Sequence, residues 1–476
     1  MSEKSNLYEI KNNTLYFEGV NLVEKIAEKY GTPTYVFSEN EIKRNLARMK
    51  EAFSTHYPQT EIAYSTKNNM VYDICSIIAN EVNYFETTSL KELMLVEKLA
   101  QINSKPLNLI STNLYKPDGL VEKLIDFGED IPDEEINSKM SSLIAIDSYQ
   151  DMKNIERVAK KLNKKASVLI RVNPGIQMSR ETTVFASAYP DAKCSVIIKN
   201  IDSIRELSKD NSINNWLLER NHNPEFDFAE RVIKEAEESE YLELMGLHGH
   251  LGSQVTNIDY FHHFFEVITL FYKLMEEKIG RKFTFLDLGG GYPVKYYKEE
   301  QIPSIDDIAR SLSDNISRAN ISPELIIESG RYITASSGLL LSQINLTKEN
   351  PSGGKIAVMD TSVYSDLLDV IAANWNFEIV LTNDIPQNKN LQKKNDWEIV
   401  GATNDTLDQL SPVHANERNS EHHVFPRDLK SKDYLTIKNT GAYTTCFNSN
   451  YCGKPKPIIA LIDKNKGINL LNRNYW

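Results

Sequence analysis

Over the first two thirds of the chain, eight short apolar runs alternate with segments in which apolar residues recur at helical intervals. The runs are rich in β-branched and aromatic residues, which favours buried strands. They lie at Glu61–Thr66, Val82–Thr88, Leu107–Thr112, Leu143–Asp147, Ser167–Val172, Leu242–Leu251, Phe283–Leu288 and Leu325–Glu328. Eight buried strands that alternate with helices predict a (β/α)8 barrel of the TIM type. A doubly wound open sheet has the same alternation, so spacing alone leaves that architecture open.

The helical patterns lie between these runs. Ser148–Leu162 begins with a serine suited to cap a helix N-terminus and continues with an acidic first turn. The polar stretch Asp210–Pro224 interrupts the alternation after the fifth run, and we expect it to lie above or beside the barrel. The other helical patterns are at Ser89–Ala100, Leu120–Phe127, Phe226–Ala236, Tyr260–Lys278 and Ile305–Ala319.

After about residue 331 the chain changes to short β-rich runs separated by polar loops. No long helical pattern intervenes, so we predict a second, mostly antiparallel β domain. Two N-terminal runs, Thr14–Phe17 and Thr34–Phe37, are also strand-like. We therefore expect N-terminal strands at 1–38 that join the β domain, a barrel at 39–332 and the β domain at 333–476. The runs of the β domain are Ser337–Asn345, Lys355–Thr361, Phe377–Leu381, Trp397–Val400, His423–Pro426, Tyr434–Lys438 and Pro457–Asp463.

The amino-acid composition argues against some classes of binding partner. The 476 residues include 66 Asp and Glu against 54 Lys and Arg, a net charge of −12. A diffuse negative surface argues against nucleic acid or an anionic membrane as partner. The four cysteines are too few for a disulfide framework, and there is no apolar leader and no apolar run long enough to span a membrane. We expect a cytoplasmic protein without a metal site, because no ligands are spaced for one.

Polar side chains gather where the predicted barrel strands end, which is where barrels of this type carry their active sites. Lys67 follows the first run, Glu86 lies at the end of the second, and Arg171 lies within the fifth. The last three runs contribute further residues suited to contact a ligand, namely His248, His250, Ser253, Gly290, Gly291, Glu328, Gly330 and Arg331.

Each of these residue types has an ordinary structural explanation, but their combination indicates one cofactor. A lysine desolvated in a barrel mouth has a lowered pKa and can form a Schiff base with an aldehyde. Glycines let backbone N–H groups approach a phosphate, which an arginine can clamp. A histidine offers a flat ring for stacking, and the buried carboxylate of Glu328 needs a cationic partner such as a protonated pyridine nitrogen. Together these features describe a site for pyridoxal 5′-phosphate.

The motifs resemble those of the fold-type III pyridoxal-phosphate decarboxylases, the family of diaminopimelate, ornithine and lysine decarboxylases. The resemblance runs from about Tyr30 to Pro457 and implies the barrel and the family's β domain. It rests on YGTPTYVFSE, AYSTKNN around Lys67, RVNPG at Arg171, GLHGHLGSQ around His250, LDLGGGYP around Gly290, ESGR at Glu328, GATNDTLD at Asn404 and NTGAYTTCFNSNY near the C-terminus.

The resemblance implies roles for the matching residues. Lys67 would hold the cofactor as a Schiff base, His250 would stack on its ring, and Glu328 would pair with the pyridine nitrogen. Glu86 would lie near the Schiff base, and Arg171 would line the pocket. The residues that would hold the phosphate are Ser253, Gly290, Gly291, Arg331 and Tyr443. Gly330 would also belong to the cofactor site. Family members are homodimers with active sites at the interface. The segments around Asp360, Asn404, Asp405 and Tyr451 would therefore complete an active site, either that of the same chain or that of the neighbouring subunit.

Asn404 departs from the family pattern. Ornithine-type enzymes have a cysteine there that supplies the proton to Cα, and diaminopimelate enzymes also carry a cysteine in that stretch. Asparagine is no general acid at ordinary pH. Either another group or water supplies the proton, or the reaction is altered, or the position is replaceable.

Sequence features that bear on the substrate resemble more than one branch of the family. Asp405 keeps the acidic residue that ornithine-type enzymes use for the distal ammonium, which favours a basic or diamino acid. The segment SNYCGKPKP resembles the diaminopimelate branch. Some family members decarboxylate an amino acid already joined to citrate. We expect an ornithine-, lysine- or diaminopimelate-like substrate, free or conjugated, in polyamine or siderophore biosynthesis.

Two alternatives on the same fold stay open. A racemase would have an arginine at the pyridine nitrogen, so Glu328 argues against it. A non-catalytic regulatory homologue would fit the missing thiol at Asn404, but it would not need Lys67, His250 and Arg331.

Overall fold

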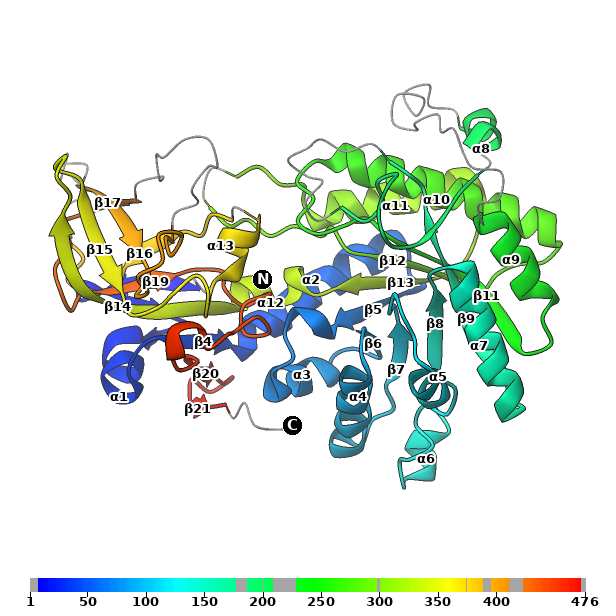
Figure 1. The fold of residues 1–476 in the computed structure, drawn as a ribbon, viewed down its shortest axis with the longest axis horizontal. Helices are drawn as coiled ribbons and strands as arrows, with labels where there is room; N and C mark the ends of the chain where they lie inside the picture. Colours follow the sequence, from blue (N-terminus) through cyan, green and yellow to red (C-terminus); the bar gives the residue numbers. More distant parts are fainter. Residues whose placement is uncertain are drawn as a thin grey trace.

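The computed structural model describes residues 7–176, 186–199, 201–208, 228–297, 300–373, 375–387, 395–410 and 423–471. A closed barrel and a curled sheet lie side by side, the barrel to the right and the sheet to the left in Figure 1. The polar stretch Asp210–Pro224, predicted to lie above or beside the barrel, falls outside the described residues.

Eight parallel strands form the barrel, and each coincides with a predicted run. Pairing of the first strand with the last, and of the fourth with the fifth, closes the ring and excludes the open sheet. The predicted barrel is therefore confirmed. In ring order the strands are β5 (Thr60–Ser65), β6 (Tyr84–Thr87), β7 (Asn108–Ser111), β8 (Ser142–Ile146), β9 (Ala166–Asn173), β11 (Leu242–His250), β12 (Phe285–Gly289) and β13 (Glu324–Ser329).

Helices surround this ring (Figure 1). Ser148 caps α7, as predicted, because its hydroxyl accepts a hydrogen bond from the backbone N–H of Asp151 at 3.1 Å. The first two helices below have no counterpart among the predicted patterns. The principal helices are α2 (Glu39–His56), α3 (Tyr72–Ala79), α4 (Leu90–Asn103), α5 (Asp118–Ile125), α7 (Tyr149–Leu162), α9 (Ala229–Glu238), α10 (Ile258–Ile279) and α11 (Ile305–Ala319). Shorter elements are α1 (Glu28–Tyr30), α6 (Glu134–Asn137), β10 (Val196–Ile197), α8 (Ile201–Leu207), α12 (Arg331–Thr334) and α13 (Leu368–Ala373).

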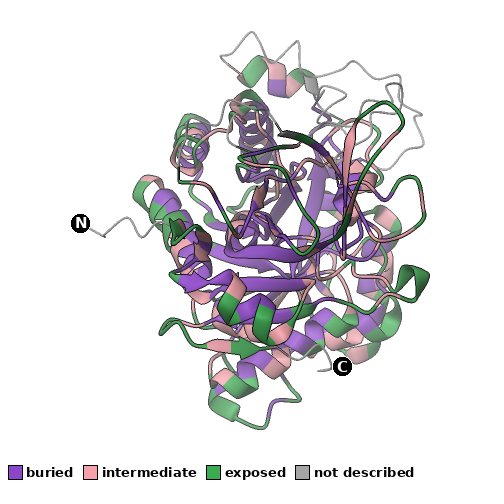
Figure 2. Cartoon of the chain, turned by 90° about the vertical axis from the view of Figure 1, so that its left-hand side faces the viewer, coloured by how far each residue is buried: buried purple, intermediate pink, exposed green. Residues whose placement is uncertain are grey.

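The barrel strands form the buried centre of this part of the molecule, and exposed residues lie on the surrounding helices (Figure 2). One cluster of buried apolar side chains comes from five strands, as expected for the filling of a barrel interior, and consists of Ala63, Ile110, Leu143, Leu169 and Ile326. Side chains alternate along a strand with a period of two. The residues two positions after Leu169 and Ile326, which are Arg171 and Glu328, therefore share the same inward face, nearer the C-terminal ends.

The second part of the molecule is a β domain built around the long strand β14 (Gly338–Glu349). This strand pairs antiparallel with β4 (Thr34–Ser38), β15 (Lys355–Met359) and β19 (Tyr434–Ile437). Only two of its strand pairs in the described residues are parallel, β15 with β17 and β4 with β20, so the prediction of a mostly antiparallel domain is confirmed. The other strands are β16 (Ile379–Leu381), β17 (Asn395–Val400), β18 (His423–Phe425), β20 (Ile458–Ile462) and β21 (Ile468–Leu470).

The N-terminal segment reaches the β domain through β4, which crosses over to pair with β14 and β20. Before it lies a small antiparallel sheet of β1 (Tyr8–Lys11), β2 (Thr14–Phe17) and β3 (Val20–Asn21). The domain boundaries at residues 38 and 332 stay predictions. Among the described helices, none is long and apolar enough to cross a membrane.

Candidate active site

A cavity of about 240 Å³ lies at the C-terminal ends of the barrel strands, and residues of the β domain form part of its wall. Six of its lining residues are not among the predicted site residues: Ser65, Gly252, Tyr292, Ser329, Asp369 and Phe447. Nine predicted site residues line it as well: Lys67, His250, Ser253, Gly290, Gly291, Glu328, Gly330, Arg331 and Tyr443.

Lys67 reaches the cavity from a short 3₁₀ turn, Thr66–Asn68, that follows β5 directly. Its Nζ lies 2.8 Å from both carboxylate oxygens of Glu86, whose side chain is fully buried at the end of β6. Burial lowers the pKa of Lys67, but the carboxylate of Glu86, together with Tyr443 and Glu328, outweighs burial and the net pKa is raised. The predicted lowering is therefore wrong, because the sequence does not show that the pairing of β5 with β6 sets a carboxylate beside the amine.

The ring of His250 lies against the glycine turn after β12. A Cβ atom added to Gly290 would come within 2.4 Å of Cε1 of His250 and 2.2 Å of the carbonyl oxygen of Gly252. Nδ1 of His250 lies 2.6 Å from the hydroxyl of Ser187. Burial, together with the charge of Lys67, lowers the pKa of His250 well below its ordinary value. The ring is therefore a neutral, flat surface fixed at the cavity wall.

Arg331 supplies a fixed positive charge at the other end of the cavity. Its Nε donates to the hydroxyl of Ser253 at 3.2 Å, and its Nη1 donates to the hydroxyl of Tyr296 at 2.8 Å. The guanidinium also lies over the rings of Trp375 and Tyr443, at 4.5 and 4.6 Å from their centroids. A guanidinium held in this way, beside a hydroxyl and a glycine turn, suits an anion with several oxygens.

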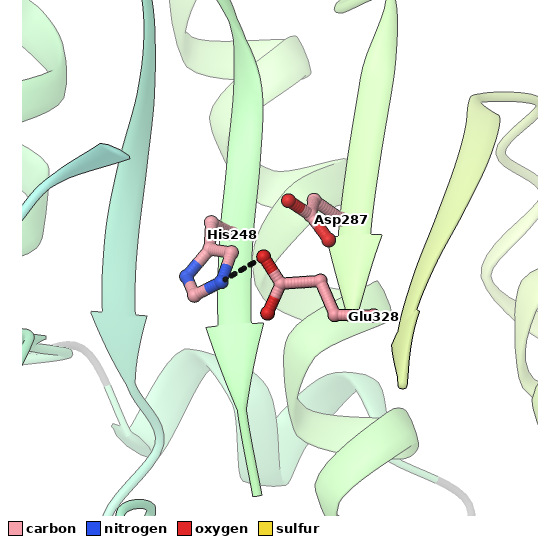
Figure 3. Close-up of side chains that lie close together, drawn as sticks. All are labelled: His248, Asp287 and Glu328. Atoms are coloured by element: carbon pink, nitrogen blue, oxygen red, sulfur yellow. Dashed lines mark ion pairs between the residues drawn. The ribbon is translucent and has the colours of Figure 1, made fainter. Parts of the chain in front are cut away.

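Glu328 projects inward from β13 to the cavity, and one residue each from β12 and β11, the two preceding strands of the ring, lies beside it (Figure 3). Nε2 of His248 lies 3.4 Å from Oε1 of Glu328. Ligand atoms of His248, Asp287 and Glu328 all lie within 4.8 Å of one another, and the three side chains are buried. The three residues come from three separate strands, so no local spacing in the sequence indicates this grouping.

The other predicted residues lie outside the cavity lining. Arg171 is buried in the barrel, where Nη1 donates to the carbonyl oxygen of Thr112 at 3.3 Å. Asp360 accepts hydrogen bonds from Thr32, from Ser342 and from the backbone N–H of Gln343 within the β domain.

Asn404, Asp405 and Tyr451 lie together on the surface of the β domain. Asn404 is exposed, and the carboxylate of Asp405 accepts from the hydroxyls of Tyr364 at 2.9 Å and Tyr451 at 3.3 Å. Burial by neighbouring groups and the hydrogen bond to Asp405 raise the pKa of Tyr364 to about 12. The substrate-binding and catalytic roles assigned to these residues and to Asp360 stay predictions.

The family described as pyridoxal-dependent decarboxylase, pyridoxal binding domain, matches residues 39–215 and 223–335. The chain belongs to this family. The match spans the barrel and includes the residues from Lys67 to Arg331 that line the cavity. The protein is thus a pyridoxal-phosphate-dependent decarboxylase, and its named relatives act on amino acids.

This decarboxylase resembles diaminopimelate decarboxylases over nearly its whole length. It is 27% identical to that of Aquifex aeolicus over 99% of this chain and 96% of the relative, and 28% identical to that of Methanocaldococcus jannaschii over 97% and 93%. A crystal structure of the M. jannaschii enzyme superposes with a TM-score of 0.79, at 24% identity, covering 98% of this chain and 94% of the other. A lysine/ornithine decarboxylase from Vibrio vulnificus, complexed with putrescine, has the same fold with a TM-score of 0.67, at 16% identity over 94% and 98%.

The cavity of the decarboxylase fits pyridoxal phosphate by its own chemistry. An amine, a fixed guanidinium and a neutral ring line one cavity with Glu328. Both oxygens of Glu328 are buried and have no conventional hydrogen bond among the described residues, so they can accept one from a ring N–H. The glycine turn leaves space that a Cβ atom at Gly290 would fill.

Proposed function

We propose that this decarboxylase removes the α-carboxylate of a diamino acid of the ornithine, lysine or diaminopimelate type. The observation that carries the proposal is that Lys67 and Glu328 line one cavity, from strands that pair with each other. The amine can hold the aldehyde of the cofactor, and the carboxylate can keep its ring nitrogen protonated. When bound there, pyridoxal phosphate supplies an electron sink for the carbanion that forms at Cα as carbon dioxide leaves.

The protein's own residues have separate tasks in this proposal. Arg331, Ser253 and the glycine turn bind the phosphate and so set the position of the ring. The neutral ring of His250 packs on the face of the cofactor without placing a positive charge beside it. The carboxylate of Glu86 stabilises the ammonium form of Lys67, and it is placed to accept the proton that Lys67 must lose before the neutral amine attacks the aldehyde.

Support for a diamino acid comes from the relatives, which are diaminopimelate decarboxylases, and from the lysine/ornithine decarboxylase of the same fold. The proposed substrate is such an amino acid, either free or conjugated as in siderophore assembly. The proposal also includes a cytoplasmic location and a homodimer, in which the surface cluster of Asp405 and Tyr451 faces a second copy and completes its cavity.

Mass spectrometry of the products made by purified, cofactor-loaded protein tests this function. The panel contains L- and D-ornithine, L- and D-lysine, meso-diaminopimelate and citryl-ornithine, with Lys67→Ala as the inactive control. Loss of carbon dioxide from one member supports the proposal and identifies the substrate and its chirality. Interconversion of enantiomers without carbon dioxide release would show a racemase instead. Turnover that persists in Lys67→Ala, or no reaction with any member by protein that binds the cofactor, would contradict the proposal.

A further inference from the structure

Asp287 lies beneath the cavity, on the inward face of β12, and is fully buried. It was not among the predicted site residues, and it does not line the cavity. Neither of its carboxylate oxygens has a hydrogen bond of conventional geometry with any described residue, and the same holds for both nitrogens of His248 and both oxygens of Glu328. These six buried polar atoms lie on three adjacent strands, and the three side chains lie close together (Figure 3).

Two ionised carboxylates cannot share such a position. Burial in a low-dielectric interior penalises each charge, and the mutual repulsion of the two adds to that cost. One imidazole can compensate one carboxylate at most. The stable arrangement therefore has a single negative charge, with a proton held between the two carboxyl groups, as in other buried carboxyl pairs.

The surroundings decide which carboxyl group keeps the proton. Burial raises the pKa of Asp287 well above its ordinary value, and the charges of Glu328 and Glu86 add to the effect, while Arg171 opposes it. Burial would also raise the pKa of Glu328, but its contact with His248 and the positive charge of Lys67 together outweigh burial and lower the pKa. Glu328 is therefore the ionised member of the pair and Asp287 the neutral one.

Gly289 fixes Glu328 on another side. A Cβ atom at this position would lie 2.3 Å from Oε2 of Glu328, so the carboxylate lies directly against the glycine backbone. Gly289 also pairs with Glu328 in the register of β12 and β13. Contacts from Gly289, His248 and Asp287 thus confine the carboxylate within the barrel.

We propose that Asp287 is a neutral carboxylic acid that donates its hydrogen to Glu328 and thereby positions the Glu328 carboxylate toward the cavity. Asp287 acts through Glu328 and is a positioning residue. The hydrogen bond from Asp287 to Glu328 does not require a ligand. Its consequence, an ionised carboxylate directed at the ring nitrogen of the cofactor, rests on the proposed function.

Infrared difference spectroscopy of the apoprotein at pH 7 tests the shared hydrogen without cofactor or substrate. The native spectrum minus that of Asp287→Asn should contain the carbonyl stretch of a protonated carboxylic acid, and this band should shift in deuterium oxide. In Glu328→Gln the band should move, because the hydrogen-bond acceptor has changed. A difference spectrum that contains only ionised carboxylate bands would overturn the proposal, and so would a stoichiometric divalent cation bound by the native protein and lost in Asp287→Asn.

Cofactor affinity tests the positioning role. Asp287→Asn keeps a donor of the same shape, whereas Asp287→Leu keeps the approximate volume and removes the donor. We expect pyridoxal phosphate to bind Asp287→Leu about tenfold or more weakly, since a hydrogen bond to a charged group is lost, and to bind Asp287→Asn within about threefold of the native protein. Equal weakening in both variants, or none in either, would overturn the positioning role. If the infrared band is present and the affinities behave as expected but no substrate loses carbon dioxide, the proposed function fails and the inference about Asp287 stands.

Discussion

Nζ of Lys67 lies 2.8 Å from each carboxylate oxygen of Glu86, so the cavity's reactive amine is paired with a carboxylate that has no exposure to solvent. The pairing of β5 with β6 puts Ser65 opposite Glu86, and the turn after β5 brings Lys67 back over the same position. The amine is therefore held in place and held as an ammonium ion.

Glu86→Gln should let Lys67 react with pyridoxal phosphate at lower pH. Only the neutral amine attacks an aldehyde, and the Glu86 carboxylate raises the pKa of Lys67, so its removal lowers that pKa. We expect the pH midpoint of the reaction to fall by about 1–3 units. The midpoint is measured by mixing the apoprotein with pyridoxal phosphate across a pH series, trapping the Schiff base with borohydride and quantifying the product by mass spectrometry. Glu61→Gln, an exposed change on β5, the strand that precedes Lys67, is the matched control. An unchanged midpoint in Glu86→Gln would refute the assignment.

Arg331→Ala should weaken binding of pyridoxal phosphate by about 10- to 100-fold but change the affinity for pyridoxal much less. The reason is that the guanidinium, held by Ser253 and Tyr296, recognises only the phosphate. Fluorescence titration of the apoprotein with both ligands gives the two dissociation constants. Arg310→Ala on the exposed face of α11 serves as control. Equal losses for both ligands would mean that Arg331 maintains the fold of the site and does not select the phosphate.

Gly290→Ala should abolish tight cofactor binding and lower the melting temperature. The new methyl group would collide with the carbonyl oxygen of Gly252 and with the ring of His250. Gly280→Ala is a matched control because both glycines have positive φ, +74° and +81°, but nothing lies within 4 Å of a Cβ atom at Gly280. We expect the control to lose only about 1 kcal/mol of folding stability from the backbone conformation. Calorimetry and cofactor titration of both variants distinguish the collision from the backbone cost. Similar behaviour of the two variants would contradict the role of the glycine turn in binding the cofactor.

Mixing two inactive variants should restore activity if Asp405 completes a neighbour's cavity. In a dimer of Lys67→Ala with Asp405→Ala, one cavity has an intact barrel together with an intact Asp405 from the other subunit. We expect turnover to return only after the two proteins are mixed and allowed to exchange subunits.

Lys67→Ala mixed with Glu328→Gln is the control for that experiment. Both changes lie in the barrel cavity of their own chain, so every mixed dimer has two defective cavities and should stay inactive. Failure of the first mixture, with subunit exchange shown by native mass spectrometry, would exclude a shared site that uses Asp405.

The sequence was informative about the site wherever the chemistry lies at the end of one strand. Lys67, His250 and Arg331 each follow or end a predicted run, and the alternation of the barrel brings such positions to one edge. The sequence did not predict properties that depend on two residues from different strands. The raised pKa of Lys67 depends on which strand lies beside β5, and the grouping of Asp287 with Glu328 depends on the register of β12 with β13. Neither the neighbour nor the register is written in local sequence patterns.

The chain by itself determined its eight strands, their alternation with helices and the residues offered at each strand end, because period and side-chain type are local properties. The tertiary structure alone decided that the sheet closes, that β4 pairs with β14 and β20, and that Asp287 lies buried beside Glu328. These outcomes depend on contacts between segments up to hundreds of residues apart. Desolvation and charge then act on whichever side chains the closed barrel brings together.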